Sequence, residues 1–177
     1  MELKEVIFKR KSVRNYTGEQ ISDEELKEIL ESANASPIGM GRFDEIHLTV
    51  VQSKELLNEI DNNAGKMFGD ETRKVLYNAP TLILISHKNV NEKTASVAYS
   101  DCACVFENMT LTATELGLGS CAIWGATMAL NSNKELVNKL NLEEGFIPCC
   151  AIAIGKTDEK FEERAKTLDK ITINYIK

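Results

Sequence analysis

Long apolar runs are missing from this chain, and no stretch reaches the roughly 20 residues that a membrane-spanning helix needs. The opening residues, "MELKEVIFKR", carry early acidic side chains and lack the apolar core of a secretory signal peptide. Excess positive charge is also missing, since the formal net charge is -6 and general nucleic-acid binding needs a basic face. We therefore expect a cytoplasmic protein that binds neither membranes nor nucleic acid.

Cysteine and histidine are too scattered for a metal centre or a disulfide framework. The five cysteines are odd in number and form no CxxC pair, and the two histidines, His47 and His87, lie far apart in the chain. Zinc sites and disulfide-rich domains depend on regular spacing of these residues. We expect reduced thiols and no bound metal.

Linkers are absent as well. No segment rich in glycine, serine or proline, no repeat and no low-complexity tract divides the 177 residues. A chain of this length can form one domain with a substantial core. We therefore expect a single domain over residues 1–177.

Apolar periodicity predicts both helices and strands. Residues 21–36 combine an amphipathic stripe with a capping box, in which Ser22 precedes Glu25 by three positions. Residues 45–51 alternate like a half-buried strand, and the apolar runs at 79–86 and 146–155 indicate strands buried on both faces. Further helices are predicted at 2–10, 53–63, 70–77, 94–116 and 133–140, and a further strand at 169–177. Because strict alternation of strands and helices is absent, we expect an α+β layered fold.

The longest predicted helix, residues 94–116, contains neither glycine nor proline and carries apolar side chains on most of its sides. Gly117 follows it, and glycine is the residue that most often ends a helix. So broad an apolar surface predicts burial on several sides.

The N-terminal stretch "KRKSVRNY" concentrates positive charge around a serine. Arg10 and Arg14 can grip phosphate oxygens through their planar donors, and the Ser12 hydroxyl can add a directional contact. In an extended chain, positions 10, 12 and 14 share one side, so the cluster can hold one phosphate group. The alternative interpretation is a solvated basic turn that pairs with the acidic helix following it.

Three stretches in order resemble the nitroreductase family of FMN-dependent oxidoreductases. "KRKSVRNY" looks like the N-terminal signature of that family, "ENMTLTATELGLGSCAIWGA" is similar to its long central helix and the loop after it, and "PCCAIAIGKTDE" resembles its late strand. With the segments between them, these stretches cover nearly the whole chain. The resemblance implies a mostly antiparallel central sheet flanked by helices, with a C-terminal strand packing on a dimer partner.

The resemblance also implies a homodimeric enzyme with FMN at the subunit interface. Hydride would pass from NAD(P)H through flavin N5 to small acceptors such as nitroaromatics or quinones, by a ping-pong mechanism. It assigns no side chain a catalytic role, because the flavin performs the transfer.

Residue by residue, the resemblance places Arg10 and Ser12 at the FMN phosphate and ribityl oxygens, with Lys11 contributing its backbone or its charge. Arg14 matches a basic residue directed at the pyrimidine edge of the flavin. There a fixed cation stabilises the negative charge of the reduced ring.

The loop "CAIWGA" matches the segment that lies along one flavin face. Ile123, Trp124 and Gly125 would bring a backbone N–H close to N5, and Gly125 would permit the close approach. Trp124 has an alternative interpretation as an ordinary aromatic residue of the core.

The chain departs from the family pattern in two places. In "ASPIGMGRFDEIH", Ser36 and Pro37 stand in swapped order, and the polar residues that usually contact the flavin are missing. Near the C-terminus, Arg164 and Lys166 are the candidates for completing the phosphate site, with surface charges as the alternative interpretation. The altered loop supports a second hypothesis, a flavin-binding or flavin-sequestering protein without meaningful turnover. A third is that residues 9–14 bind an acidic protein partner.

Overall fold

The computed structural model describes residues 1–177 and contains a four-stranded antiparallel sheet with the order β1-β2-β4-β3. The strands are β1 (Ile46–Val51), β2 (Thr81–Lys88), β3 (Gly119–Ala122) and β4 (Phe146–Gly155). The helices are α1 (Leu3–Lys9), α2 (Asp23–Asn34), α3 (Lys54–Met67), α4 (Ala95–Glu115), α5 (Trp124–Asn131) and α6 (Lys134–Asn138), with two short 3-10 turns at Gly39–Gly41 and Phe43–Glu45. The predicted α+β fold is confirmed.

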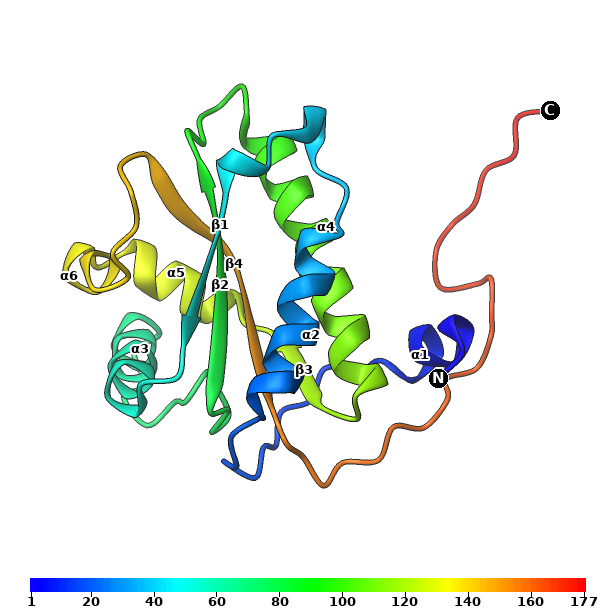
Figure 1. The fold of residues 1–177 in the computed structure, drawn as a ribbon, viewed down its shortest axis with the longest axis horizontal. Coiled ribbons are helices and arrows are strands. Elements are labelled where there is room, and N and C mark those ends of the chain that lie inside the picture. Colours follow the sequence, from blue (N-terminus) through cyan, green and yellow to red (C-terminus); the bar gives the residue numbers. More distant parts are fainter.

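Helices cover both faces of the sheet (Figure 1). α2 and α4 lie on one face, and α3, α5 and α6 lie on the other. Strand β2 shows why: Leu82 and Leu84 join the core on the α3 and α5 side, while Ile83 and Ile85 join the core on the α2 and α4 side. All four side chains are fully buried, so the strand is apolar throughout, as its sequence predicted.

The N-terminal cap of α2 has the predicted form. Ser22 Oγ accepts a hydrogen bond from the Glu25 backbone N–H at 3.1 Å, and Glu25 Oε2 accepts one from the Ser22 N–H at 2.7 Å. These bonds satisfy two backbone donors that the first turn leaves without partners.

The long helix α4 packs against α1, α2 and strands β2, β3 and β4, which confirms its predicted burial on several sides. It ends where predicted, with Gly117 in the left-handed conformation at φ 75° and the Leu118 N–H bonded to the Ala113 carbonyl. No helix in the structure is long and apolar enough to cross a membrane.

Two local predictions were wrong. Residues 70–77 form turns instead of a helix, and the segment "GSCAIWGA" was expected to be a loop but contains strand β3 and the start of α5. β3 exists because it pairs with β4, with Cys121 opposite Ala153. Four residues are too few to reveal a strand by alternation alone.

Residues 156–177 contain no helix or strand, and the last of them extend past α1 and away from the sheet (Figure 1). The strand predicted at 169–177 is therefore not formed within one chain. A strand needs a neighbour to bond its backbone groups, and this tail has none inside the chain. Its large apolar side chains are exposed, including Leu168, Ile171, Tyr175 and Ile176.

Candidate functional site

The basic segment leaves α1 and runs beside strand β3. Ser12 and Ser120 form a parallel bridge, and the Val13 N–H donates to the Ser120 carbonyl at 2.9 Å. Val13 is completely buried, whereas Ser12 and Arg14 are exposed on the opposite side of the extended chain. Beyond this bridge the segment turns toward the residues that follow β4, where the Thr17 N–H donates to the Lys156 carbonyl at 3.0 Å.

The four cations of this segment are unequally neutralised, and the first of them, Lys9, pairs with Glu5 at 2.6 Å. Lys11 Nζ forms an ion pair with Glu159 at 2.7 Å, and Arg10 Nε lies 3.9 Å from Glu107 on α4. Arg14 has no ion-pair partner, although its backbone N–H donates to Glu159 at 3.4 Å. The hydrogen bond from Lys11 is the main reason that the pKa of Glu159 lies below its usual value. The predicted alternative, a pairing with the acidic helix α2, was wrong.

Cys121 on β3 lies next to this cluster and is buried. Burial raises the pKa of its thiol. The positive charge of Arg14, a hydrogen bond from the Ser12 side chain and the positive charge of Arg10 offset this rise only in part. The thiol is therefore protonated near neutral pH and is a poor nucleophile. All five cysteines are free, and no group of three or more potential ligand side chains is arranged to hold a metal ion.

Strand β3 leads directly into α5 through Ile123. Ile123 is buried, Gly125 is half-buried, and the Trp124 side chain is 59% exposed, so the core interpretation of Trp124 was wrong. No side chain caps the N-terminus of α5, which leaves the first backbone N–H groups without intrahelical partners. Gly125 packs closely against the end of α3, since an added Cβ would lie 3.2 Å from Phe68 Cε2.

Trp124 has one aromatic neighbour that no sequence motif predicts. The ring of Tyr99 on α4 lies 6.4 Å from the Trp124 ring between centroids, with an interplanar angle of 50°. The two residues are far apart in the chain, and Tyr99 belongs to no recognised motif. Only the three-dimensional structure, which brings the start of α5 near α4, reveals the pair.

Ser36 and Pro37 are separated from the basic segment within one chain. The Ser36 hydroxyl is buried and accepts a hydrogen bond from Asn108 Nδ2 at 3.0 Å, and Pro37 is exposed. The next turn is fixed by a bond from the Gly39 N–H to Asp101 Oδ1 at 2.9 Å. No hydrogen bond or ion pair joins this loop to residues 10–14.

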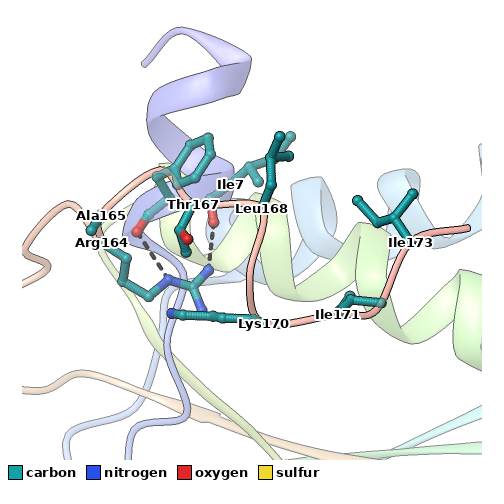
Figure 2. Close-up of a pocket in the computed structure, with 9 residues that line it drawn as sticks. Ile7, Arg164, Ala165, Thr167, Leu168, Lys170, Ile171 and Ile173 are labelled. Carbon is teal, nitrogen blue, oxygen red and sulfur yellow. Dashed lines mark hydrogen bonds between the residues drawn. The ribbon is translucent and has the colours of Figure 1, made fainter.

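Both C-terminal candidates lie against α1, and Figure 2 shows Arg164 there. The Arg164 guanidinium donates to the Phe8 carbonyl at 3.2 Å through Nε and to the Ile7 carbonyl at 2.8 Å through an Nη. These carbonyls are at the end of α1, beside Arg10. Lys166 pairs with Glu163 at 2.8 Å and lies 5.3 Å above the Phe8 ring. The structure thus brings Arg164 close to the basic segment and leaves Lys166 further out along the tail.

Comparison with known proteins gives a consistent result. Residues 7–156 match the model of the Nitroreductase family. A protein of Methanothermobacter thermautotrophicus, designated a candidate NADH dehydrogenase/NAD(P)H nitroreductase, is 29% identical over 158 residues, covering 88% of this chain and 77% of its own length. One with the same designation from Archaeoglobus fulgidus is 29% identical over 162 residues, covering 90% and 88%.

Solved structures resemble the whole chain. A nitroreductase with bound FMN from Bacteroides fragilis superimposes with a TM-score of 0.84 at 29% identity, covering 99% of this chain and 100% of that one. A nitroreductase with bound FMN from Desulfitobacterium hafniense gives a TM-score of 0.83 at 25% identity, with the same coverage.

Proposed function

The chain belongs to the nitroreductase family of FMN-dependent NAD(P)H oxidoreductases, and we propose on this basis that it passes hydride from NAD(P)H to small electron acceptors such as nitroaromatics or quinones. Residues 1–177 would act as one domain. The observation that carries the proposal is the juxtaposition, along one edge strand, of a basic segment and an uncapped helix N-terminus.

The residues present fit FMN. At one end of β3, Arg10 and Ser12 offer donors for a phosphate and the first ribityl oxygens, and Ser120 Oγ is buried opposite Ser12 without a hydrogen-bond partner. At the other end, Trp124 and Gly125 present free backbone N–H groups. The four residue-to-residue steps from Ser120 to Trp124 span about 13 Å of extended chain. This separation suits a phosphate joined through a five-carbon chain to a ring system.

Each residue then has a physical role. Arg10 and Ser12 would hold the phosphate, with Arg164 or Lys166 nearby and Lys11 adding positive charge. Arg14 would place a cation without an ion-pair partner at the ring edge, where it stabilises added negative charge. The N–H groups at the start of α5, aided by the positive end of the helix dipole, would orient the ring. When bound, FMN supplies the two-electron carrier chemistry that these side chains lack.

A homodimer is part of this proposal. In one chain Ser12, Arg14 and Trp124 lie on the open surface, and the tail exposes a series of apolar side chains. A second copy of the chain would cover both, with FMN between the two and the tail strand forming against the partner. Ser36 and Pro37 would then reach the cofactor only across the interface.

The test starts from purified protein. Bound flavin should give the protein its characteristic absorbance bands, either as isolated or after FMN is added, and NADH or NADPH should bleach them under anaerobic conditions. Protein that shows no flavin absorbance after FMN is added would refute the proposal.

A second candidate, flavin binding without turnover, is favoured by one observation. The only side-chain hydroxyl of the altered 36–43 loop, on Ser36, is occupied by Asn108 inside the same chain, so this loop offers few polar side chains to a flavin or its substrates. Stopped-flow mixing of the flavin-loaded protein with NADH or NADPH separates the two functions. A binding protein would leave its flavin oxidised over minutes, whereas an oxidoreductase would bleach it.

A further inference from the structure

We propose that Cys102 and Cys149 form an oxidation site, at which hydrogen peroxide converts their two thiols into one disulfide that joins α4 to β4. The inference goes beyond the proposed function and does not depend on FMN. It starts from the distribution of the five cysteines in the fold. Three of them, Cys102, Cys149 and Cys150, come together in the core between the sheet and α4, away from the basic segment.

A β-bulge directs both cysteines of β4 into this core. On β2, Ile85 pairs with Cys150. The next residue, Ser86, pairs with Pro148, which leaves Cys149 as the extra residue of the bulge. In a regular strand, two adjacent side chains point to opposite faces of the sheet. Here the extra residue lets Cys149 and Cys150 both join the α2 and α4 side of the core.

The thiols of Cys102 and Cys149 interact with each other. Both residues are buried, and the hydrogen bond between the two thiols is the main reason that the pKa of Cys102 is raised and that of Cys149 is lowered. Burial opposes the lowering at Cys149, and the His87 backbone N–H adds to it. Cys149 Sγ itself donates to the Ile147 carbonyl at 3.4 Å, which leaves its sulfur lone pairs to accept from Cys102. Cys149 is therefore the thiol that loses its proton more readily.

This difference assigns the order of the reaction. The Cys149 sulfur attacks one oxygen of the peroxide, so that the O–O bond breaks, an S–O bond forms and one water leaves, with Cys149 now a sulfenic acid. The Cys102 sulfur then attacks the Cys149 sulfur, so that the S–O bond breaks, the S–S bond forms and a second water leaves. The two thiols together lose two electrons and two protons, and these reduce one hydrogen peroxide to two water molecules.

Cys150 is less suited to either role, although it lies in the same cluster. Burial raises the pKa of Cys150 to about 11, so its thiol keeps its proton near neutral pH. A bond between Cys149 and Cys150 is also unfavourable. Consecutive Cα atoms are about 3.8 Å apart, whereas disulfides usually span roughly 4.4–6.8 Å between Cα atoms. The geometry therefore favours the link between α4 and β4.

The first experiment treats the purified full-length protein with excess hydrogen peroxide and then counts free thiols after unfolding. The wild type should lose two of its five thiols and regain both with dithiothreitol. Cys102→Ala and Cys149→Ala should lose no such pair. Cys104→Ala is the matched control, because Cys104 is also on α4 but lies outside this core cluster. The control should lose two thiols, as the wild type does.

Mass spectrometry of unreduced proteolytic peptides identifies the two partners. The linked peptides should weigh two hydrogens less than the sum of the free peptides. Because Cys149 and Cys150 fall in one peptide, the assignment is made in Cys150→Ala, which should keep the link to Cys102. This variant retains both proposed partners, so it decides the question even if Cys102→Ala or Cys149→Ala fails to fold.

The results that would overturn the inference are specific. Wild-type protein that keeps all five thiols in excess peroxide, or that loses them without recovery in dithiothreitol, would refute the oxidation site. A disulfide that still forms in Cys102→Ala or Cys149→Ala, or a link that disappears in Cys150→Ala, would refute the assigned pair. The thiols are counted without added FMN or NAD(P)H, so this inference and the proposed function can fail independently.

Discussion

Replacing Glu107 by glutamine removes the carboxylate that faces Arg10, and we expect the change to tighten FMN binding about three- to tenfold. Glu107 lies on α4 with its Oε1 3.9 Å from Arg10 Nε. In the proposed site the phosphate of FMN needs the same guanidinium. The carboxylate therefore competes with the ligand for Arg10 and also repels it.

The magnitude follows from distance and exposure. Two unit charges about 4 Å apart interact by about 1 kcal/mol in water and about 4 kcal/mol in a medium of dielectric constant 20. The Arg10 and Glu107 side chains are 24% and 52% exposed, so the interaction is near the lower figure. Measured exposed pairs contribute about 0.2–1 kcal/mol, and relief of repulsion with the phosphate adds a similar amount. A total near 1 kcal/mol corresponds to a several-fold change in affinity.

The assay is titration of the apoprotein with FMN, followed by flavin fluorescence, at low and high salt. Glu115→Gln is the matched control: Glu115 is also on α4, is 51% exposed and pairs with the N-terminal amine. That variant should leave FMN affinity unchanged. The effect of Glu107→Gln should shrink at 1 M salt, where screening reduces the Debye length to about 3 Å. Equal or weaker FMN binding by Glu107→Gln at low salt would show that Glu107 positions Arg10 instead of competing for it.

Three further predictions concern the same structure. Arg14→Ala should weaken FMN binding by about 10- to 100-fold in the same titration, since a charge-assisted contact is lost, whereas a site for an acidic protein would leave flavin affinity unchanged. The lowered pKa of Glu159 stabilises the folded protein at pH values above 4.5, the usual pKa of that carboxyl group, and Lys11→Met should remove this stabilisation. The urea unfolding curves of the variant and the wild type should therefore differ at neutral pH and converge as the pH falls through the lowered pKa. Leu84→Ala, in the fully buried strand β2, should cost about 2–5 kcal/mol in the same unfolding assay.

Most of the fold could be predicted because its larger elements carry strong local patterns. β2 and β4 are continuous apolar runs, and α4 is long and free of helix breakers. The turns at 70–77 were not predictable in this way, because a distant group holds them. Asp61 on α3 accepts a hydrogen bond from the Leu76 N–H at 2.9 Å, and burial raises the pKa of Asp61. Asp70 also bonds the Thr72 N–H locally, which competes with helix formation.

In the candidate site too, residues close together in the chain could be predicted and distant ones could not. The basic side chains at 10–14 were visible in the sequence because they are neighbours in the chain, and the bridge to β3 confirms the extended backbone that places Ser12 and Arg14 on one side. Their carboxylate neighbours were not visible. Glu107 and Glu159 come from α4 and from the segment after β4, and nothing local in the sequence connects them to this cluster.

The tail bears on the proposal that a second copy of the chain completes this site. Residues 169–177 alternate like a strand but find no partner strand inside the chain, and the apolar side chains of the tail, such as Ile171 and Tyr175, stay exposed. A strand satisfies its backbone groups only by pairing, so the pattern can be fulfilled only by another polypeptide. The strand prediction and the dimer proposal therefore depend on each other. If the protein is monomeric at micromolar concentration with FMN bound, the alternation at 169–177 has no structural meaning and the flavin must bind to a surface that one chain provides alone.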